Sequence, residues 1–140
     1  DAPPEEDGPL RAAMENEGLT LIRMAAPTSD DSRLRRILSG AKGFLYYVSV
    51  TGVTGVKAVA SDAAGAAVQR VRAQSDIPVA VGFGVRTEEQ AASVARTADA
   101  VVVGSAIVDV IEKASTPAQA VADALALTKK LASAAHAARK

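Results

Sequence analysis

Four short runs of apolar residues, separated by segments with helical spacing, constrain the fold of this chain more than any other feature. The runs cover residues 19–26, 43–50, 77–85 and 100–108. They are rich in Val, Ile and Leu and do not alternate with polar residues, which is typical of strands buried on both faces of a parallel sheet. Their starts lie about 22–35 residues apart, the length of a β-α-β unit. The pattern predicts one α/β domain over residues 1–140, with right-handed crossovers.

Capping signals predict helices between and around these runs. Ser29 should begin a helix that ends just before Gly40, and a first helix over about residues 9–16 should close at Gly18. Thr followed three residues later by Gln predicts a capping box at the starts of two further helices. The boxes are Thr87 with Gln90 and Thr116 with Gln119, and the last helix is expected to bury Val121, Leu125 and Leu131.

The composition excludes several classes of protein. With 16 basic and 16 acidic residues the formal net charge is zero, which argues against nucleic-acid binding. The absence of cysteine excludes a disulfide scaffold, a thiolate zinc site and cysteine catalysis. His136 is the only histidine, and we expect it on the surface of a helix rather than in a metal site. No apolar run is long enough to span a membrane. The compartment stays open from the residues, and the cytoplasm is the default expectation. Because the sequence starts at Asp1 without methionine, we expect it to be part of a longer protein.

Two architectures accept this order of elements: a doubly wound open sheet, and half of a (β/α)₈ barrel. In both, ligands bind beyond the carboxyl ends of the strands. The third run contains Gly82 and Gly84, and the fourth contains Gly104 and Ser105. Glycine lets backbone N–H groups approach an anion closely, and the start of a following helix adds partial positive charge. These glycines therefore predict a phosphate cradle. The dinucleotide, P-loop and nucleophile-elbow motifs are all incomplete here, which disfavours those three alternatives.

The stretches GFLYYVSVTGVTG, DIPVAVGFGV and ADAVVVGSAIVD identify a resemblance that covers essentially the whole chain. Together with DAPPEE at the start and APTSDD after the first run, they resemble the C-terminal half of the tryptophan synthase alpha subunit family. The resemblance implies a (β/α)₈ TIM barrel of which this chain carries strands five to eight. It also implies a lyase of tryptophan biosynthesis that cleaves indole-3-glycerol phosphate to indole and glyceraldehyde 3-phosphate. The alpha subunit would need no cofactor, and its partner in an α2β2 complex would be a beta subunit that uses pyridoxal phosphate.

The resemblance also assigns roles to individual residues. Thr54 corresponds to a supporting residue in a lid loop over residues 51–62, which hydrogen-bonds an active-site aspartate. Asp1 corresponds to an acidic position near the beta subunit, and Val50 stands where many family members have arginine. No catalytic carboxylate is expected in this chain, because the family's acid–base residues lie in the N-terminal half of the barrel. The substrate-binding positions are Met24 and Tyr46 at the indole ring, Phe83 at both ends of the substrate, and Gly55, Gly84, Gly104 and Ser105 at the phosphate.

Two other functions remain open from the residues. One is an autonomous, non-catalytic half-barrel that binds phosphate and pairs with itself. The other is a different sugar-phosphate barrel enzyme, such as an isomerase or epimerase, which the TGVTG lid disfavours.

Overall fold

A four-stranded parallel sheet forms the centre of the computed structural model, which describes residues 2–48, 57–82 and 84–139. The strands lie in sequence order, and each pairs in parallel with the next. The chain therefore moves in one direction across the sheet, as in a barrel, whereas a doubly wound sheet reverses at a switch point. The strands are β1 (Arg23–Ala25), β2 (Leu45–Val48), β3 (Val79–Gly82) and β4 (Ala100–Val102).

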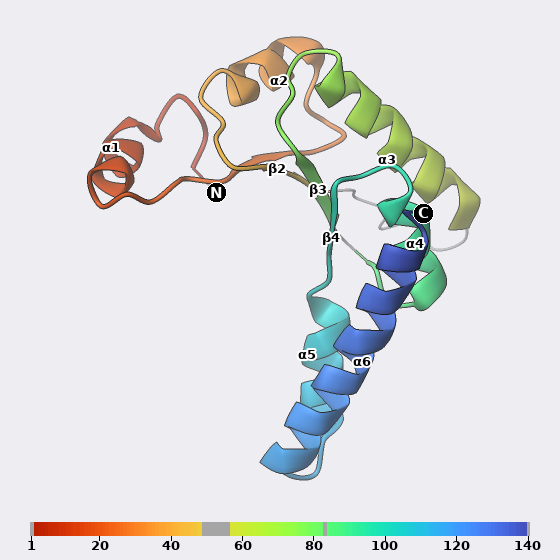
Figure 1. The fold of residues 1–140 in the computed structure, drawn as a ribbon. Coiled ribbons are helices and arrows are strands. Elements are labelled where there is room, and N and C mark those ends of the chain that lie inside the picture. The colour runs from red at the N-terminus through yellow and green to blue at the C-terminus, as the bar shows by residue number, and fades with distance from the viewer. Residues whose placement is uncertain (1, 49–56, 83, 140) are drawn as a thin grey trace.

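A helix follows each strand. The helices are α1 (Gly8–Asn16), α2 (Asp31–Leu38), α3 (Lys57–Arg72), α4 (Glu88–Ala95), α5 (Ser105–Lys113) and α6 (Pro117–Ala137). Helices α2, α3 and α4 cover one side of the sheet (Figure 1). The opposite side is left open, and α5 and α6 extend away from the sheet as a packed pair. None of the helices in the described part of the chain is long and apolar enough to cross a membrane.

The main core lies between the sheet and the helices α2 and α3. Small side chains on α3, such as Ala64 and Ala67, let the helix approach the strands closely. Alternate strand residues point into this core, because successive side chains of a strand lie on opposite faces. Its fully buried larger members are Leu45, Val68, Val71, Val79 and Val81.

A buried ion pair attaches the N-terminal segment to the first strand. The Asp7 side chain is 1% exposed, and its Oδ2 atom accepts a hydrogen bond of 2.5 Å from Nη2 of Arg23. The Nη1 atom of Arg23 donates to the carbonyl of Ile37 at 2.9 Å, near the end of α2. Arg23 thus joins three elements, and its side chain is not available to the solvent at the sheet edge.

The structure confirms several predicted helix boundaries and corrects others. Gly18 adopts φ +69° just after α1, and the complete capping box of Thr87 and Gln90 begins α4. At α2 the expected cap is wrong: Asp30, not Ser29, accepts the Arg33 N–H at 2.7 Å. The Ser29 hydroxyl instead accepts from the Ala26 N–H. The carboxylate of the next residue therefore replaces the hydroxyl as the helix cap.

The prediction was less accurate at the C-terminal end of the chain. The fourth strand ends at Val102. Residues 105–108, which the apolar pattern assigns to the strand, form the first turn of α5. In α6, Leu131 is buried as expected, but Val121 and Leu125 are 61% and 65% exposed. Thr116 accepts from the Gln119 N–H, whereas the Gln119 side chain accepts from Ser115 rather than completing the box.

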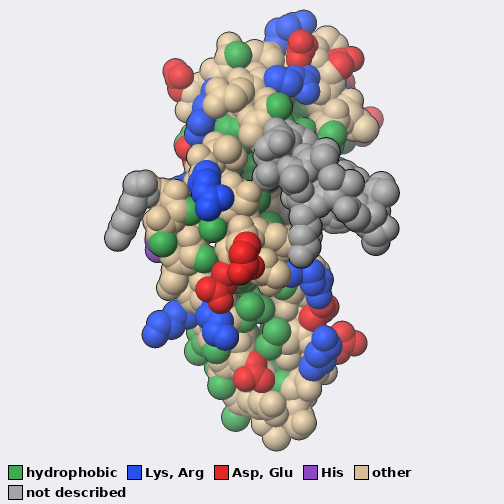
Figure 2. All heavy atoms as spheres, turned by 90° about the vertical axis from the view of Figure 1, so that its right-hand side faces the viewer, with side chains coloured by type: hydrophobic (Ala, Val, Ile, Leu, Met, Phe, Trp, Pro, Cys, Tyr) green, Lys and Arg blue, Asp and Glu red, His purple; other side chains and the backbone are tan. Residues whose placement is uncertain are grey.

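Charged side chains of both signs are interspersed over the face of the molecule shown in Figure 2. Toward the end formed by α5 and α6, hydrophobic side chains reach the surface in the same view. The exposed apolar residues of that pair are Val108, Ile111, Val121 and Leu125.

Candidate functional site

The carboxyl ends of β3 and β4 bring the two predicted glycine motifs side by side. Gly82 pairs in register with Val102, so that Gly84 and Gly104 each follow two residues beyond this pair. Gly84 has φ +71°, in the left-handed region that glycine favours. A carbon atom added at Gly84 or Gly104 would meet no atom of the described residues within 4 Å. With respect to this described part of the chain, the backbone borders open space at both positions, as a ligand site requires.

Helix α5 begins at this same edge with its first N–H groups uncapped. Its N-cap is Gly104, which offers no side chain, whereas side chains cap α2, α4 and α6. The first four N–H groups of a helix have no acceptor within the helix and carry partial positive charge. Ser105, the first residue of α5, is exposed and adds a hydroxyl. Backbone donors, helix dipole and hydroxyl together form an arrangement suited to an anion.

Arg86 adds a cation that the sequence analysis did not identify. Its Nη1 atom donates to Oγ of Ser105 at 3.4 Å, and its Nη2 atom forms an ion pair with Asp109 on α5. These partners lie 19 and 23 residues away in the sequence, so no local pattern marks Arg86 as part of this edge. Only its position two residues after Gly84 could have indicated from the sequence that Arg86 lies near the phosphate site.

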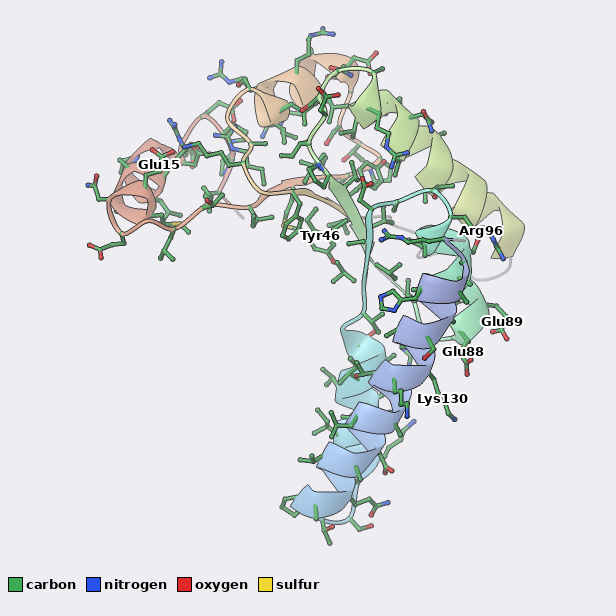
Figure 3. The ribbon with its side chains drawn as sticks, in the orientation of Figure 1. Glu15, Tyr46, Glu88, Glu89, Arg96 and Lys130 are labelled. Atoms are coloured by element: carbon green, nitrogen blue, oxygen red, sulfur yellow. The ribbon has the colours of Figure 1, made fainter. Side chains whose placement is uncertain are left out.

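Met24 and Tyr46 lie on the sheet face away from the main core. They are register partners on β1 and β2, and both are half-buried. Figure 3 shows Tyr46 extending to the side of the sheet opposite α3. A carbon atom added at Gly82 would lie 2.7 Å from Tyr46 Oη and 2.7 Å from Val102 Cβ. The tyrosine ring therefore lies across Gly82, and a continuous surface runs from β1 toward β4.

The remaining predicted site residues lie outside the described parts of the chain. These are Asp1, Thr54, Gly55 and Phe83, together with Val50 and residues 51–56 of the expected lid. The second half of that expected loop, residues 57–62, belongs to the first turns of α3.

The described residues show no metal centre. They contain no group of three or more His, Asp or Glu side chains placed to hold an ion. His136 is exposed on α6, as expected, where it borders a hollow of about 390 Å³ between α6 and β4.

Comparison with known proteins decides the family. The model of the tryptophan synthase alpha chain family matches residues 1–136. The chain belongs to this family. Among curated relatives, the tryptophan synthase alpha chain of Zymomonas mobilis is 55% identical over the whole chain, which spans 52% of that protein. The alpha chain of Novosphingobium aromaticivorans is 51% identical, and this chain spans 52% of its length.

Solved structures agree with this assignment. Tryptophan synthase from Mycobacterium tuberculosis matches with a TM-score of 0.80 and 38% identity, covering 96% of this chain and 48% of that one. The alpha chain from Legionella pneumophila matches with a TM-score of 0.78 and 33% identity, covering 97% and 50%. The chain thus spans about half the length of the proteins it matches. The predicted fold class is confirmed: the four strands are half of a (β/α)₈ barrel, corresponding to the C-terminal half of the family.

Proposed function

We propose that this chain supplies the phosphate site, one wall of the indole pocket and the lid loop of a tryptophan synthase alpha chain. The complete alpha chain would cleave indole-3-glycerol phosphate to indole and glyceraldehyde 3-phosphate, as a carbon–oxygen lyase of tryptophan biosynthesis. The observation that carries the proposal is the edge shared by β3 and β4. There, Gly84, Gly104 and Ser105 surround the uncapped start of α5 beside open space.

The phosphate would bind to backbone N–H groups and to one hydroxyl. The N–H groups of Gly84, Gly104 and the first turn of α5 suit the oxygens of a dianion, and Ser105 adds a neutral donor. Gly55 and Phe83 would complete the phosphate site.

The indole ring would lie against the face that carries Met24 and Tyr46, with Phe83 beside them. Thr54 would act from the lid loop, orienting an aspartate of the other half when the loop closes. Asp1 would lie near the beta subunit.

Proton transfer would come from outside this chain. Cleavage requires a proton delivered to the indole ring and a proton removed from a glycerol hydroxyl, which positioned carboxylates perform. We place both carboxylates in the N-terminal half of the barrel and propose that this chain alone is inactive. The alpha chain itself would use no cofactor. Its partner would be the pyridoxal phosphate-dependent beta subunit in a cytoplasmic α2β2 complex, which would receive the indole.

Replacing Ser105 tests the phosphate site. In the complete alpha chain, Ser105→Ala should weaken binding of indole-3-glycerol phosphate by about 1–2 kcal/mol, because a hydrogen bond to a charged group is lost. Binding of indole, which carries no phosphate, should stay the same. Isothermal titration with both ligands measures the difference. Ser115→Ala, which changes an exposed serine between α5 and α6, is the matched control. Equal losses for both ligands would contradict the assignment.

A further inference from the structure

The guanidinium of Arg86 bridges two loops that meet at the proposed phosphate site. Its own backbone is fixed on the β3 side: the Arg86 N–H donates to Oε1 of Gln90 at 2.7 Å, and the Thr87 N–H donates to the same oxygen at 3.1 Å. The capping interactions of α4 therefore hold the main chain of Arg86, while its side chain extends toward α5.

On the α5 side, the guanidinium has two partners one helical turn apart. Ser105 and Asp109 are separated by four residues and so lie on the same face of the helix. Arg86 donates to the hydroxyl of Ser105 and pairs with the carboxylate of Asp109. A planar guanidinium with several fixed N–H groups can satisfy both partners at once, which a lysine ammonium on a flexible stem does less well.

The chemistry of the two side chains fixes which one donates the hydrogen bond between Arg86 and Ser105. Arginine can only donate hydrogen bonds, so Ser105 Oγ must act as the acceptor toward Arg86. The single hydroxyl hydrogen of Ser105 is then not used in that contact and can be donated to another oxygen. A phosphate oxygen at the start of α5 accepts such a bond.

The charge of Arg86 has a second effect at the same place. Asp109 lies on the first turns of α5, where its negative charge would repel a phosphate dianion. The ion pair with Arg86 offsets that charge. The pair itself contributes little to folding, because both side chains are well exposed, at 49% and 35%.

We propose that Arg86 is a positioning residue for phosphate binding, which holds the Ser105 hydroxyl as a donor and neutralises Asp109. This inference rests on the proposed function, since it concerns the same phosphate site. Arg86 would act through Ser105 rather than by touching the substrate.

Steady-state kinetics of the complete alpha chain test the proposal. Arg86→Ala should raise the KM for indole-3-glycerol phosphate about tenfold, and the inhibition constant of inorganic phosphate by a similar factor, with kcat little changed. Arg86→Lys should restore part of the loss. Arg72→Ala is the matched control, because Arg72 forms a similarly exposed ion pair with Asp99, which caps the opposite end of β3. This control should leave KM unchanged.

A double-mutant cycle separates positioning from other roles. In a Ser105→Ala background, Arg86→Ala should raise KM by clearly less than tenfold, because the hydroxyl that Arg86 positions is already absent and only the unpaired charge of Asp109 is left to act. A full tenfold loss in that background would overturn the proposal in favour of direct contact or a general loop role, and an unchanged KM for Arg86→Ala alone would also overturn it. If the unmodified alpha chain neither cleaved indole-3-glycerol phosphate nor bound inorganic phosphate, the proposed function itself would fail instead.

Discussion

Gly82 illustrates how one residue without a side chain shapes the open face of the sheet. It lies between Tyr46 on β2 and Val102 on β4, and the space that a Cβ would need is already occupied by both neighbours. The tyrosine oxygen is at the end of a side chain that can move, but the Val102 Cβ is fixed to its strand. A larger residue must therefore disturb both the ring and the strand pairing.

We predict that Gly82→Ala weakens indole binding in the complete alpha chain and lowers its stability by about 1–3 kcal/mol, as expected for overpacking. The displaced Tyr46 ring would change the wall of the proposed indole pocket more than the phosphate edge. Calorimetric titration with indole and with inorganic phosphate measures both effects. Gly8→Ala is the control, because a carbon atom added there meets no atom within 4 Å. An unchanged indole affinity would show that Tyr46 does not line the pocket.

Side chains specify the starts of three helices, α2, α4 and α6, whereas α1 and α5 begin without a side-chain cap. Asp30, Thr87 and Thr116 each accept a backbone N–H at the start of their helix. Of these three caps, Thr87 and Thr116 were predicted from the sequence. Helix α5 has a glycine at its N-cap and no such signal, which explains why its apolar residues were assigned to a strand. The feature that hid the helix from sequence analysis is also the feature that leaves its first N–H groups open.

The cap of α2 predicts a measurable dependence of stability on pH. Hydrogen bonds from the Arg33 N–H and then from the Ser32 hydroxyl hold the pKa of Asp30 below its ordinary value of 3.8. The folded state thus favours the charged carboxylate. Its contribution is present above the unfolded pKa and is lost as the pH falls through the folded pKa. Asp30→Asn keeps a capping acceptor that does not titrate.

We therefore expect the complete alpha chain to lose less stability between pH 5 and about pH 2 when it carries Asp30→Asn. Urea unfolding at a series of pH values measures this. Asp76→Asn is the comparison, because Asp76 lies in an exposed segment outside the helices. If Asp30→Asn and the unmodified protein showed the same acid dependence, Asp30 would not be a cap in solution.

The sequence predicts the order of strands, most helices and the glycines of the phosphate edge, because these features are local. Apolar runs, capping pairs and glycine spacing each occupy a few neighbouring residues. Arg86 and the pair of Asp7 with Arg23 could not be predicted in this way. Their partners lie 16 or more residues away, and only the folded chain brings them together. Nothing local to Arg23 indicates that its charged side chain is buried beside the end of α2.

The sheet of the whole molecule has two edge strands. In the described part of the chain, β1 and β4 each have a neighbouring strand on one side only. A hollow of about 740 Å³, bordered by Ile22, Met24 and Val48 among others, lies beside β1, and the hollow of about 390 Å³ lies beside β4. The neighbouring pair α5 and α6 also exposes apolar side chains. A closed barrel has no such edges, because its first and last strands pair.

These free edges predict the behaviour of the 140-residue chain when it is produced alone. Each large apolar side chain that stays exposed to water lacks roughly 1.5–3 kcal/mol of stabilising free energy that its burial would contribute. The free energy of unfolding of a typical domain is only about 5–15 kcal/mol. Unpaired strand edges also offer backbone donors and acceptors to another copy. The isolated chain should therefore dimerise, aggregate or lose fixed packing, and it should not cleave indole-3-glycerol phosphate. Adding the other half of the alpha chain should restore both a discrete species and cleavage.

Sedimentation velocity and amide hydrogen exchange test this expectation together. At micromolar concentration, the isolated chain should not be both a single monomeric species and well protected, and the amides of β1 and β4 should exchange faster than those of β2 and β3. With the other half present, protection should extend to β1 and β4, because each edge gains a partner strand. A monodisperse, uniformly protected monomer without the other half would instead support an autonomous half-barrel, and cleavage by that monomer would contradict the placement of the catalytic carboxylates.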